Sequence, residues 1–381
     1  MKRVLFGVVL VMVTALAAGP MAVAQETYKI GAVLAITGPA SYFGEDERNT
    51  LQLLQDQVNA RGGIGGKKVD MVIYDDASDP TKSVTALRRL HEEDKVLAVI
   101  GGSISGNSLA MIPFSEKAGV PQLVPAASAK ISNPVKKWAF QFCSTDVQAI
   151  SLILTFLKGK GITNIAMLAD STAYGVSGKE ELERQAPAQG FKVAAWETFG
   201  PTDTDMTAQL TRIKASGARA VLVWNATPAS AIVAKNFKQL GLDALQIQST
   251  AYVSARQLQL AGDAAEGIYL SGYKIPVVDQ LPASDPQKKL LAEFREAYGK
   301  RFGREPNAYA ALAYDAFTAL VKVLPATGAD RDKIRQALEG LKNHVGAAGI
   351  YTMSPTDHNG FQVESMPMLV VEKGAFRLVG R

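Results

Sequence analysis

The stretch KVLAVIGGSISGNSLAMIPFSEKAG, residues 95–119, contains three kinds of sequence in succession. Residues 95–102 form a short apolar run, and residues 103–106 are mostly small and polar. Residues 107–119 place apolar side chains at three- and four-residue spacing and end at a glycine. The apolar run predicts a buried strand, and the spacing that follows predicts a helix that begins near Gly106 or Asn107. The stretch is therefore one strand–turn–helix unit, the repeating element of a parallel sheet covered by helices.

The same succession of strand and helix extends along almost the whole chain. Short apolar runs predict buried strands at residues 28–36, 68–75, 95–102, 164–170, 191–199, 219–225 and 267–273. Segments with helical spacing lie between them, at residues 48–61, 83–94, 107–119, 149–161, 206–217 and 230–241. This alternation predicts an α/β fold in which parallel sheets are covered on both faces.

The chain is long enough for two domains. It has 381 residues, of which 47% are hydrophobic and 20% are charged, whereas a domain usually contains about 100–150 residues. The strand–helix series restarts near residues 143–148, which predicts two similar lobes. Residues 285–342 then carry mainly helical patterns, and residues 367–379 are typical of a hairpin of two strands.

The first 24 residues have the pattern of a secretory signal peptide. Lys2 and Arg3 precede an apolar run at residues 4–18, and residues 22–24 supply a small-x-small cleavage site. The apolar run, about 15 residues long, is shorter than the roughly 20 residues that span a bilayer as a helix. We therefore expect cleavage near Ala24 and a mature protein in the periplasm.

Cysteine content and charge exclude several classes of protein. Cys143 is the only cysteine, so an intramolecular disulfide is impossible and stability must come from the core. Lys and Arg number 41 against 36 Asp and Glu. The basic residues occur as scattered pairs, which is typical of a solvated surface and not of a nucleic-acid-binding patch. We expect no nucleic-acid partner.

The glycine and serine residues of the sequence do not form a known catalytic motif. Gly101, Gly102 and Gly106 lack the G-x-G-x-x-G spacing of dinucleotide sites, and RGGIGGKK at residues 61–68 lacks the spacing of a phosphate-binding P-loop. A nucleophile elbow, G-x-S-x-G, would need glycine at the position of Ser105. None of the three histidines stands in a metal-binding motif. We therefore predict no enzyme activity, no catalytic residue, no cofactor and no metal.

The turn at residues 103–106 instead suits a small anion. Free backbone N–H groups at the start of the following helix, together with serine hydroxyls, can bind a carboxylate. LVPAASAK, residues 123–130, also ends a strand in small residues. Because the carboxyl ends of parallel strands open into the same crevice, the two turns can face one ligand. Plain tight turns are the alternative interpretation.

Six motifs together resemble one known family. They are IGAVLAITGPASYFG (30–44), QDQVNARGGIGGKKVDMVIYDDASDP (55–80), VIGGSISGNS (99–108), VPAASA (124–129), DSTAYG (170–175) and AYAALAYDAF (308–317). In this order and spacing the chain resembles the periplasmic solute-binding proteins of branched-chain amino-acid ABC importers, which include the leucine/isoleucine/valine-binding proteins. The resemblance covers essentially the whole chain after residue 24.

The resemblance implies the type I periplasmic binding fold, in which two Rossmann-like lobes with parallel sheets are joined by three crossovers. Lobe one would comprise residues 25–145 and 275–353, and lobe two residues 146–274 and 354–381. The lobes would close on a small-molecule carboxylate or amino acid by a hinge motion. The implied protein is a monomer that delivers its ligand to the membrane permease of an importer.

The resemblance also implies the site residues. Ser105, Ala126 and Ser128 match the positions that hold the ligand carboxylate in the family. Tyr174 would close over the ligand from lobe two, and Tyr314 is a further candidate for the rim of the pocket.

Three departures from the family concern the ligand. Thr250 stands where branched-chain amino-acid binders have an acid that receives the ligand ammonium. Phe43, with Tyr42 beside it, replaces a frequent tyrosine, and Ala226 replaces another. An unpaired ammonium in a closed cleft would cost several kcal/mol. We therefore predict a hydrophobic carboxylate without an α-amino group, such as an aromatic or branched acid. A branched-chain or other neutral amino acid is the alternative.

Overall fold

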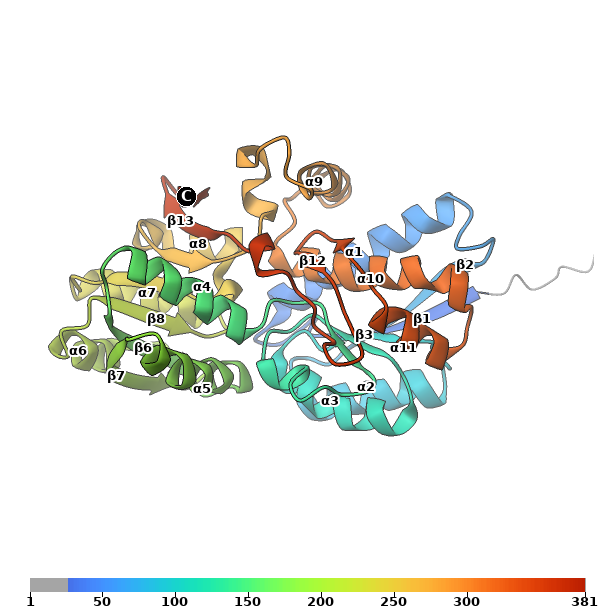
Figure 1. Cartoon of the computed structure of the whole chain (residues 1–381), viewed down its shortest axis with the longest axis horizontal. Coiled ribbons are helices and arrows are strands. Elements are labelled where there is room, and N and C mark those ends of the chain that lie inside the picture. Colours follow the sequence, from blue (N-terminus) through green and yellow to red (C-terminus); the bar gives the residue numbers. More distant parts are fainter. Residues whose placement is uncertain (1–26, 381) are drawn as a thin grey trace, which may run out of the picture.

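The computed structural model describes residues 27–380, so the expected signal peptide at residues 1–24 lies outside the described residues. Two large sheets lie side by side, each with its own helices (Figure 1). The first has five parallel strands in the order β2 (Lys68–Asp75), β1 (Thr27–Leu34), β3 (Val99–Gly101), β4 (Gln122–Val124) and β5 (Ala139–Gln141). We call this sheet and the helices packed on it the first lobe.

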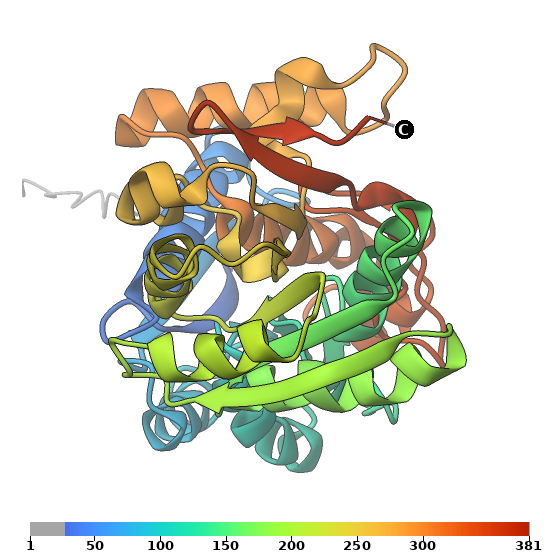
Figure 2. The same cartoon turned by 90° about the vertical axis from the view of Figure 1, so that its left-hand side faces the viewer.

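The second sheet has seven strands and defines the second lobe. Its order is β14 (Ala375–Leu378), β13 (Met368–Glu372), β10 (Tyr269–Ser271), β9 (Leu245–Gln248), β8 (Ala220–Trp224), β6 (Asn164–Asp170) and β7 (Lys192–Phe199). The strands from β10 to β7 run parallel, whereas β13 and β14 form the antiparallel hairpin that the sequence predicts. This C-terminal hairpin forms one edge of the sheet (Figure 2).

The helices cover the sheets as the sequence pattern requires. The first lobe carries α1 (Ser41–Ala60), α2 (Pro80–Glu92), α3 (Ser105–Ala118), α10 (Ala308–Thr327) and α11 (Arg331–Glu339), together with the small sheet of β11 (His344–Val345) and β12 (Ile350–Tyr351). The second lobe carries α4 (Asp146–Gly159), α5 (Ala173–Ala188), α6 (Thr207–Ala215), α7 (Ala229–Gln239) and α8 (Ala255–Ala261). Helix α9 (Lys288–Phe302) packs against α1 and the 3-10 turn η4 (Ile275–Gln280).

Local sequence signals fix several helix ends. Asp79 caps α2, because its side chain accepts hydrogen bonds from the N–H groups of Thr81 and Lys82. Thr145 and Gln148 form a capping box at the start of α4. Helix α3 ends at Gly119, whose φ of 62° is the left-handed conformation that favours glycine.

Some predicted elements differ from the structure. Helix α1 begins at Ser41 and not near residue 48, and α3 begins at Ser105. Strand β5 and helix α5 had no counterpart in the sequence prediction. Helix α10 is long and apolar enough to cross a membrane by composition, but most of it is buried and it packs against α1, as a core helix does.

The chain passes between the lobes three times, as expected: after β5, after β10 and between β12 and β13.

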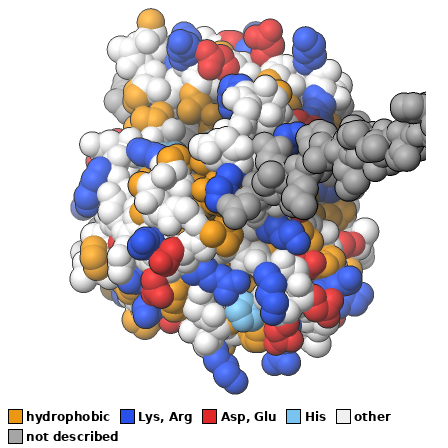
Figure 3. All heavy atoms as spheres, turned by 90° about the vertical axis from the view of Figure 1, so that its right-hand side faces the viewer, with side chains coloured by type: hydrophobic (Ala, Val, Ile, Leu, Met, Phe, Trp, Pro, Cys, Tyr) orange, Lys and Arg blue, Asp and Glu red, His pale blue; other side chains and the backbone are white. Residues whose placement is uncertain are grey.

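Side chains of both charge signs lie interspersed on the end of the first lobe (Figure 3). The residue ranges that we assigned to the two hinged lobes stay a proposal.

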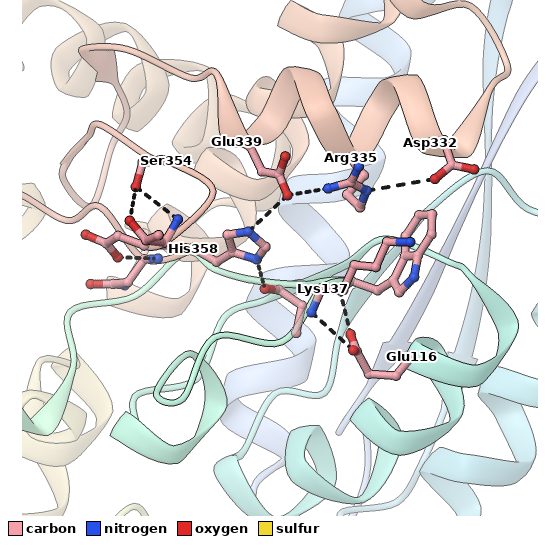
Figure 4. A network of polar contacts seen from close by, with 12 residues as sticks. Glu116, Lys137, Asp332, Arg335, Glu339, Ser354 and His358 are labelled. Carbon is pink, nitrogen blue, oxygen red and sulfur yellow. Dashed lines mark hydrogen bonds and ion pairs between the residues drawn. The ribbon is translucent and has the colours of Figure 1, made fainter.

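The third pass is anchored to the first lobe beside the first pass (Figure 4). His358 Nδ1 donates to the carbonyl oxygen of Ala139 (3.0 Å), and His358 Nε2 lies 3.3 Å from a carboxylate oxygen of Glu339 in α11. The side chain of Asn359 donates to the carbonyl oxygens of Gln141 (3.1 Å) and Cys143 (2.8 Å). These bonds tie two of the three connections together.

Candidate ligand-binding site

A small cavity lies between the two lobes. Its walls are formed by Phe43, Ser103, Ile104, Ser105, Pro125, Ala126, Ala127, Cys143, Tyr174, Ala226, Thr250, Ala251, Tyr273, Tyr309 and Leu312. The cavity has a volume of about 30 Å³, enough for only about two water molecules. Any larger ligand therefore requires the lobes to move apart, and the three connections between them permit a hinge motion of this kind.

The loop between β3 and α3 forms one wall of the cavity. Gly101 has a φ of 140°, and a Cβ there would lie 2.1 Å from the carbonyl oxygen of Val33, so only glycine fits. Ser108 Oγ donates to the carbonyl oxygen of Gly102 (2.7 Å) and holds the loop against α3. Ser105 is the first residue of α3, so the free N–H groups of the first helical turn begin at the cavity.

The turn after β4 lies beside this loop. The N–H of Ser128 donates to Ser105 Oγ (3.2 Å), which leaves the Ser105 hydroxyl hydrogen free to donate. The side chain of Gln141 donates to the carbonyl oxygen of Ala126 (2.6 Å) and fixes the turn. Within residues 27–380, the N–H of Ala126 makes no hydrogen bond, although the residue is buried. A buried donor without a partner is unusual and suits a ligand oxygen.

The second lobe contributes Tyr174 and Thr250. Their hydroxyl groups lie 3.3 Å apart, and the Tyr174 ring lies 5.6 Å from the ring of Trp224. Burial raises the pKa of Tyr174 well above its ordinary value, so the phenol is neutral. Thr250 and Ala226, where the sequence is expected to depart from the family, both line the cavity.

Aromatic rings from the first lobe close another side. Phe43 stacks on Tyr309 with ring centroids 3.7 Å apart, and Tyr309 donates to the carbonyl oxygen of Ala251 in the second lobe (3.5 Å). Tyr42 lies next to Phe43 but lines a different, larger cavity of about 680 Å³. Its hydroxyl accepts a hydrogen bond from the side chain of Gln257 in the second lobe (3.4 Å).

Five of the eight predicted site residues line the cavity, and Ser128, Tyr42 and Tyr314 do not. Ser105, Ala126, Tyr174, Thr250 and Phe43 lie on the cavity wall. Ser128 lies directly behind the wall, on Ser105.

The structure places Tyr314, the further candidate for the pocket rim, away from the cavity. Its ring packs on Phe294 of α9, at 4.8 Å between centroids, and it lines neither of these cavities. Five residues of α-helix correspond to a rotation of about 140°, so Tyr309 faces the cavity while Tyr314 faces α9. Counting helical positions within the motif at residues 308–317 could have found Tyr309.

Sequence reasoning also missed three groups at the cavity: Ser103, Cys143 and Tyr273. Cys143 Sγ lies 3.2 Å from the hydroxyl of Tyr273. Burial raises the pKa of the Cys143 thiol to about 12, so it is neutral and a poor nucleophile. Ser103 lies in the motif at residues 99–108, whereas Cys143 and Tyr273 lie in none of the six motifs.

The cavity wall has hydrogen-bond donors but no charged side chain. None of the lining residues within 27–380 is Asp, Glu, Lys, Arg or His. Two acids of the second lobe lie behind the wall: Asp170 accepts from the N–H of the lining residue Ala226 (3.4 Å), and Asp146 accepts from Trp224 Nε1 (3.1 Å). Burial raises the pKa of both, that of Asp146 to about 7. The wall is suited to non-covalent binding of a small, largely apolar molecule.

Two lobes, three connections and a neutral cavity between them are the architecture of a binding protein. The sequence model of the periplasmic binding protein family matches residues 27–375, so the chain belongs to this family. It is a solute-binding protein and not an enzyme, and its resemblance to the branched-chain amino-acid type is confirmed.

Individual proteins agree with this assignment. The leucine-, isoleucine-, valine-, threonine- and alanine-binding protein of Pseudomonas aeruginosa is 28% identical over 322 residues, which are 83% of each chain. An extracellular ligand-binding receptor from Rhodopseudomonas palustris HaA2 has a TM-score of 0.87 at 27% identity, covering 93% of this chain and 100% of that one. A leucine binding protein from Thermotoga maritima has a TM-score of 0.82 at 26% identity, covering 93% and 98%.

Proposed function

We propose that this protein is the exported, periplasmic solute-binding component of an ABC importer of the branched-chain amino-acid type, and that it captures a small hydrophobic carboxylate. The family and the relatives support a binding role. The neutral cavity between two hinged lobes supports capture of one small molecule. The protein acts as a monomer and delivers its ligand to a membrane permease, whose ATPase hydrolyses nucleotide.

The cavity wall carries the argument for a carboxylate. The Ser105 hydroxyl, the N–H of Ala126 and the first turn of α3 supply donors for an anionic oxygen. Apolar surface from Phe43 and Leu312 suits the rest of the ligand. A single negative charge on an apolar body fits these groups.

The absence of an acid among the lining residues within 27–380 argues against an α-amino group. An ammonium group enclosed beside Thr250 would lose its water and gain no carboxylate partner. A branched-chain or other neutral amino acid is the alternative ligand, and the name of the Pseudomonas relative supports it.

Several contacts between the lobes stabilise the closed form of the protein. Lys130 in the first lobe pairs with Glu180 of α5 in the second lobe, at 2.6 Å. Together with the bond from Tyr309 to Ala251 and the bond from Gln257 to Tyr42, it stabilises the closed form. A bound ligand adds contacts to both lobes and shifts the equilibrium further toward closure.

The test uses two matched pairs of ligands that differ only in the α-amino group: 4-methylpentanoate with leucine, and 3-phenylpropanoate with phenylalanine. Each is titrated into the mature protein, and thermal stabilisation and Kd are measured. We expect at least one acid to bind more tightly than its amino-acid partner. Stabilisation by leucine or phenylalanine alone would contradict the carboxylate proposal and support the alternative.

A further inference from the structure

Glu47 in α1 lies one hydrogen bond behind the cavity wall. Its side chain is completely buried. The hydroxyl of Ser103, a cavity-lining residue, donates to Glu47 Oε2 and accepts from the N–H of Ala35 (3.0 Å). The other carboxyl oxygen, Glu47 Oε1, has no hydrogen-bond partner among residues 27–380. The single hydrogen of Ser103 is thus committed to Glu47 and is not offered to a ligand.

The charged groups nearest to Glu47 are acids. Asp46, on the same helix, is paired with Arg304. Asp76, which follows β2, is buried and accepts from Ser83 Oγ (2.8 Å) and from the side chain of Asn107 in α3 (2.8 Å). Arg304 pairs with Asp46 and not with Glu47, and the two hydrogen-bond donors to Asp76 are neutral.

The remaining titratable groups around Glu47 are neutral. Tyr298 of α9 donates to Asp46, Tyr309 of α10 is a buried phenol, and Cys143 faces from the connection after β5. Within residues 27–380, no Lys, Arg or His lies within ion-pair distance of Glu47. Burial raises the pKa of Glu47 to about 8, and the charges of Asp76 and Asp46 act in the same direction, against the Ser103 bond.

A ligand carboxylate would add another negative charge at this wall. Ser105, which we propose as a donor to the ligand, is two residues from Ser103 in the same loop. In a closed and nearly dry cavity, a ligand carboxylate bound to Ser105 and the Glu47 carboxylate bound to Ser103 cannot both stay ionised without a large repulsion. The ligand is a stronger acid than Glu47 and keeps its charge, so Glu47 is the group that takes up a proton.

From this geometry we propose that Glu47 holds a proton whenever the cleft closes on a carboxylate, so that ligand capture is coupled to proton uptake at alkaline pH. Glu47 then acts as a specificity residue, because a zwitterionic amino acid brings a positive charge that offsets its carboxylate and removes the coupling. The inference rests on the carboxylate function proposed above and adds a property that this function alone does not require.

The coupling has a defined pH range. Below pH 7 Glu47 is already protonated, and the affinity for the acid is independent of pH. Above pH 8 the free protein must take up a proton to bind, so the affinity falls as pH rises. If binding moves the pKa of Glu47 well above 9, Kd increases about tenfold between pH 7 and pH 9.

The experiment measures binding of 4-methylpentanoate and 3-phenylpropanoate by calorimetry at pH 6, 7, 8 and 9. Each titration is run in two buffers with different ionisation enthalpies, which gives the number of protons taken up per ligand. The wild-type protein is compared with Glu47→Gln, which cannot titrate. Glu45→Gln is the matched control, since Glu45 lies on the same helix but lines the larger cavity.

We expect the wild type and Glu45→Gln to take up nearly one proton at pH 9 and none at pH 6. Glu47→Gln should take up none at either pH, and its Kd should be constant. Acid binding without proton uptake by the wild type would overturn the coupling and leave the carboxylate function intact. Uptake that persists in Glu47→Gln would assign the proton elsewhere and also overturn it. If only amino acids bind, both proposals fail. If Glu47→Gln does not fold, absence of proton uptake by the wild type still overturns the coupling. Ser103→Ala then assigns the proton, because it removes the bond that favours the charged form of Glu47 and should shift the onset of uptake to higher pH.

Discussion

Ser128 Oγ in the first lobe donates a hydrogen bond to Ser177 Oγ in the second lobe, at 2.9 Å. Both side chains are buried, and Ser128 also bonds to Ser105 through its backbone N–H. The turn that we expect to hold the ligand carboxylate is therefore also the turn that contacts the opposite lobe. Ligand binding and closure share this residue.

Ser128→Ala should remove the bond between the lobes and weaken ligand binding by about 0.5–1.5 kcal/mol. Ser177→Ala should have a similar effect, and the double variant should be no weaker than either single one, because the same bond is lost. Kd values of the three variants for the best acid of the matched panel measure this. Fully additive effects would show that the two hydroxyls act independently.

Ser105→Ala should weaken binding by roughly 1–3 kcal/mol, because the variant lacks the hydroxyl that we expect to donate to a buried carboxylate. Titration calorimetry at pH 6 keeps Glu47 protonated and isolates this effect. Ser284→Ala, at an exposed position away from the cavity, is the control and should bind as the wild type does. Unchanged affinity in Ser105→Ala would remove Ser105 from the site.

Thr250→Asp should change the ligand preference of the cavity from the acid to the amino acid. The new carboxylate can receive an ammonium group and repels an acid, so the ratio of leucine affinity to 4-methylpentanoate affinity should rise by at least about tenfold. Thr250→Asn is the matched control of similar size without charge. Equal ratios in the two variants would show that position 250 does not face the ligand's α-carbon.

His344 should make the protein sensitive to acid. Burial, aided by the charge of Lys322, lowers the pKa of His344 from 6.5 to about 4 in the folded state. In the unfolded chain the imidazole binds a proton below pH 6.5, so the stability contributed by neutral His344 is lost as pH falls from 6.5 toward 4.

The free energy of unfolding should fall by about 2 kcal/mol more in the wild type than in His344→Gln between pH 7 and pH 5. Urea denaturation at both pH values measures the difference. Both proteins contain the same carboxyl groups, so the contribution of these groups to the pH dependence of stability cancels in the comparison. A parallel decrease in both proteins would show that His344 is protonated in the folded state.

The sequence predicted the two-lobed α/β fold because apolar runs and helical spacing record burial directly. The sequence prediction failed where the buried residues of an element are polar or where the element is short. Helix α1 was started too late because Asp46, Glu47 and Asn49 are buried and interrupt the apolar pattern that marks a helix. Strand β5 spans three residues, too few for any periodicity, and α5 is mainly polar.

The same limit applies to the site. The loops with Ser105 and Ala126 could be predicted, because their small residues follow strands whose ends meet. Glu47 could not, because a buried acid in a helix has the same sequence signature as a solvated one. Only the structure shows that it contacts Ser103.

The bonds from Asn359 to the carbonyl oxygens of Gln141 and Cys143 have a mechanical consequence. Two of the three connections are fastened to each other, so they cannot bend or slide independently. This linkage hinders twisting and sliding of the lobes against each other and leaves rotation about one hinge axis as the easiest motion. The lobes would then open along the same path each time. Their outer faces would present the same relative orientation to a permease whenever the protein closes.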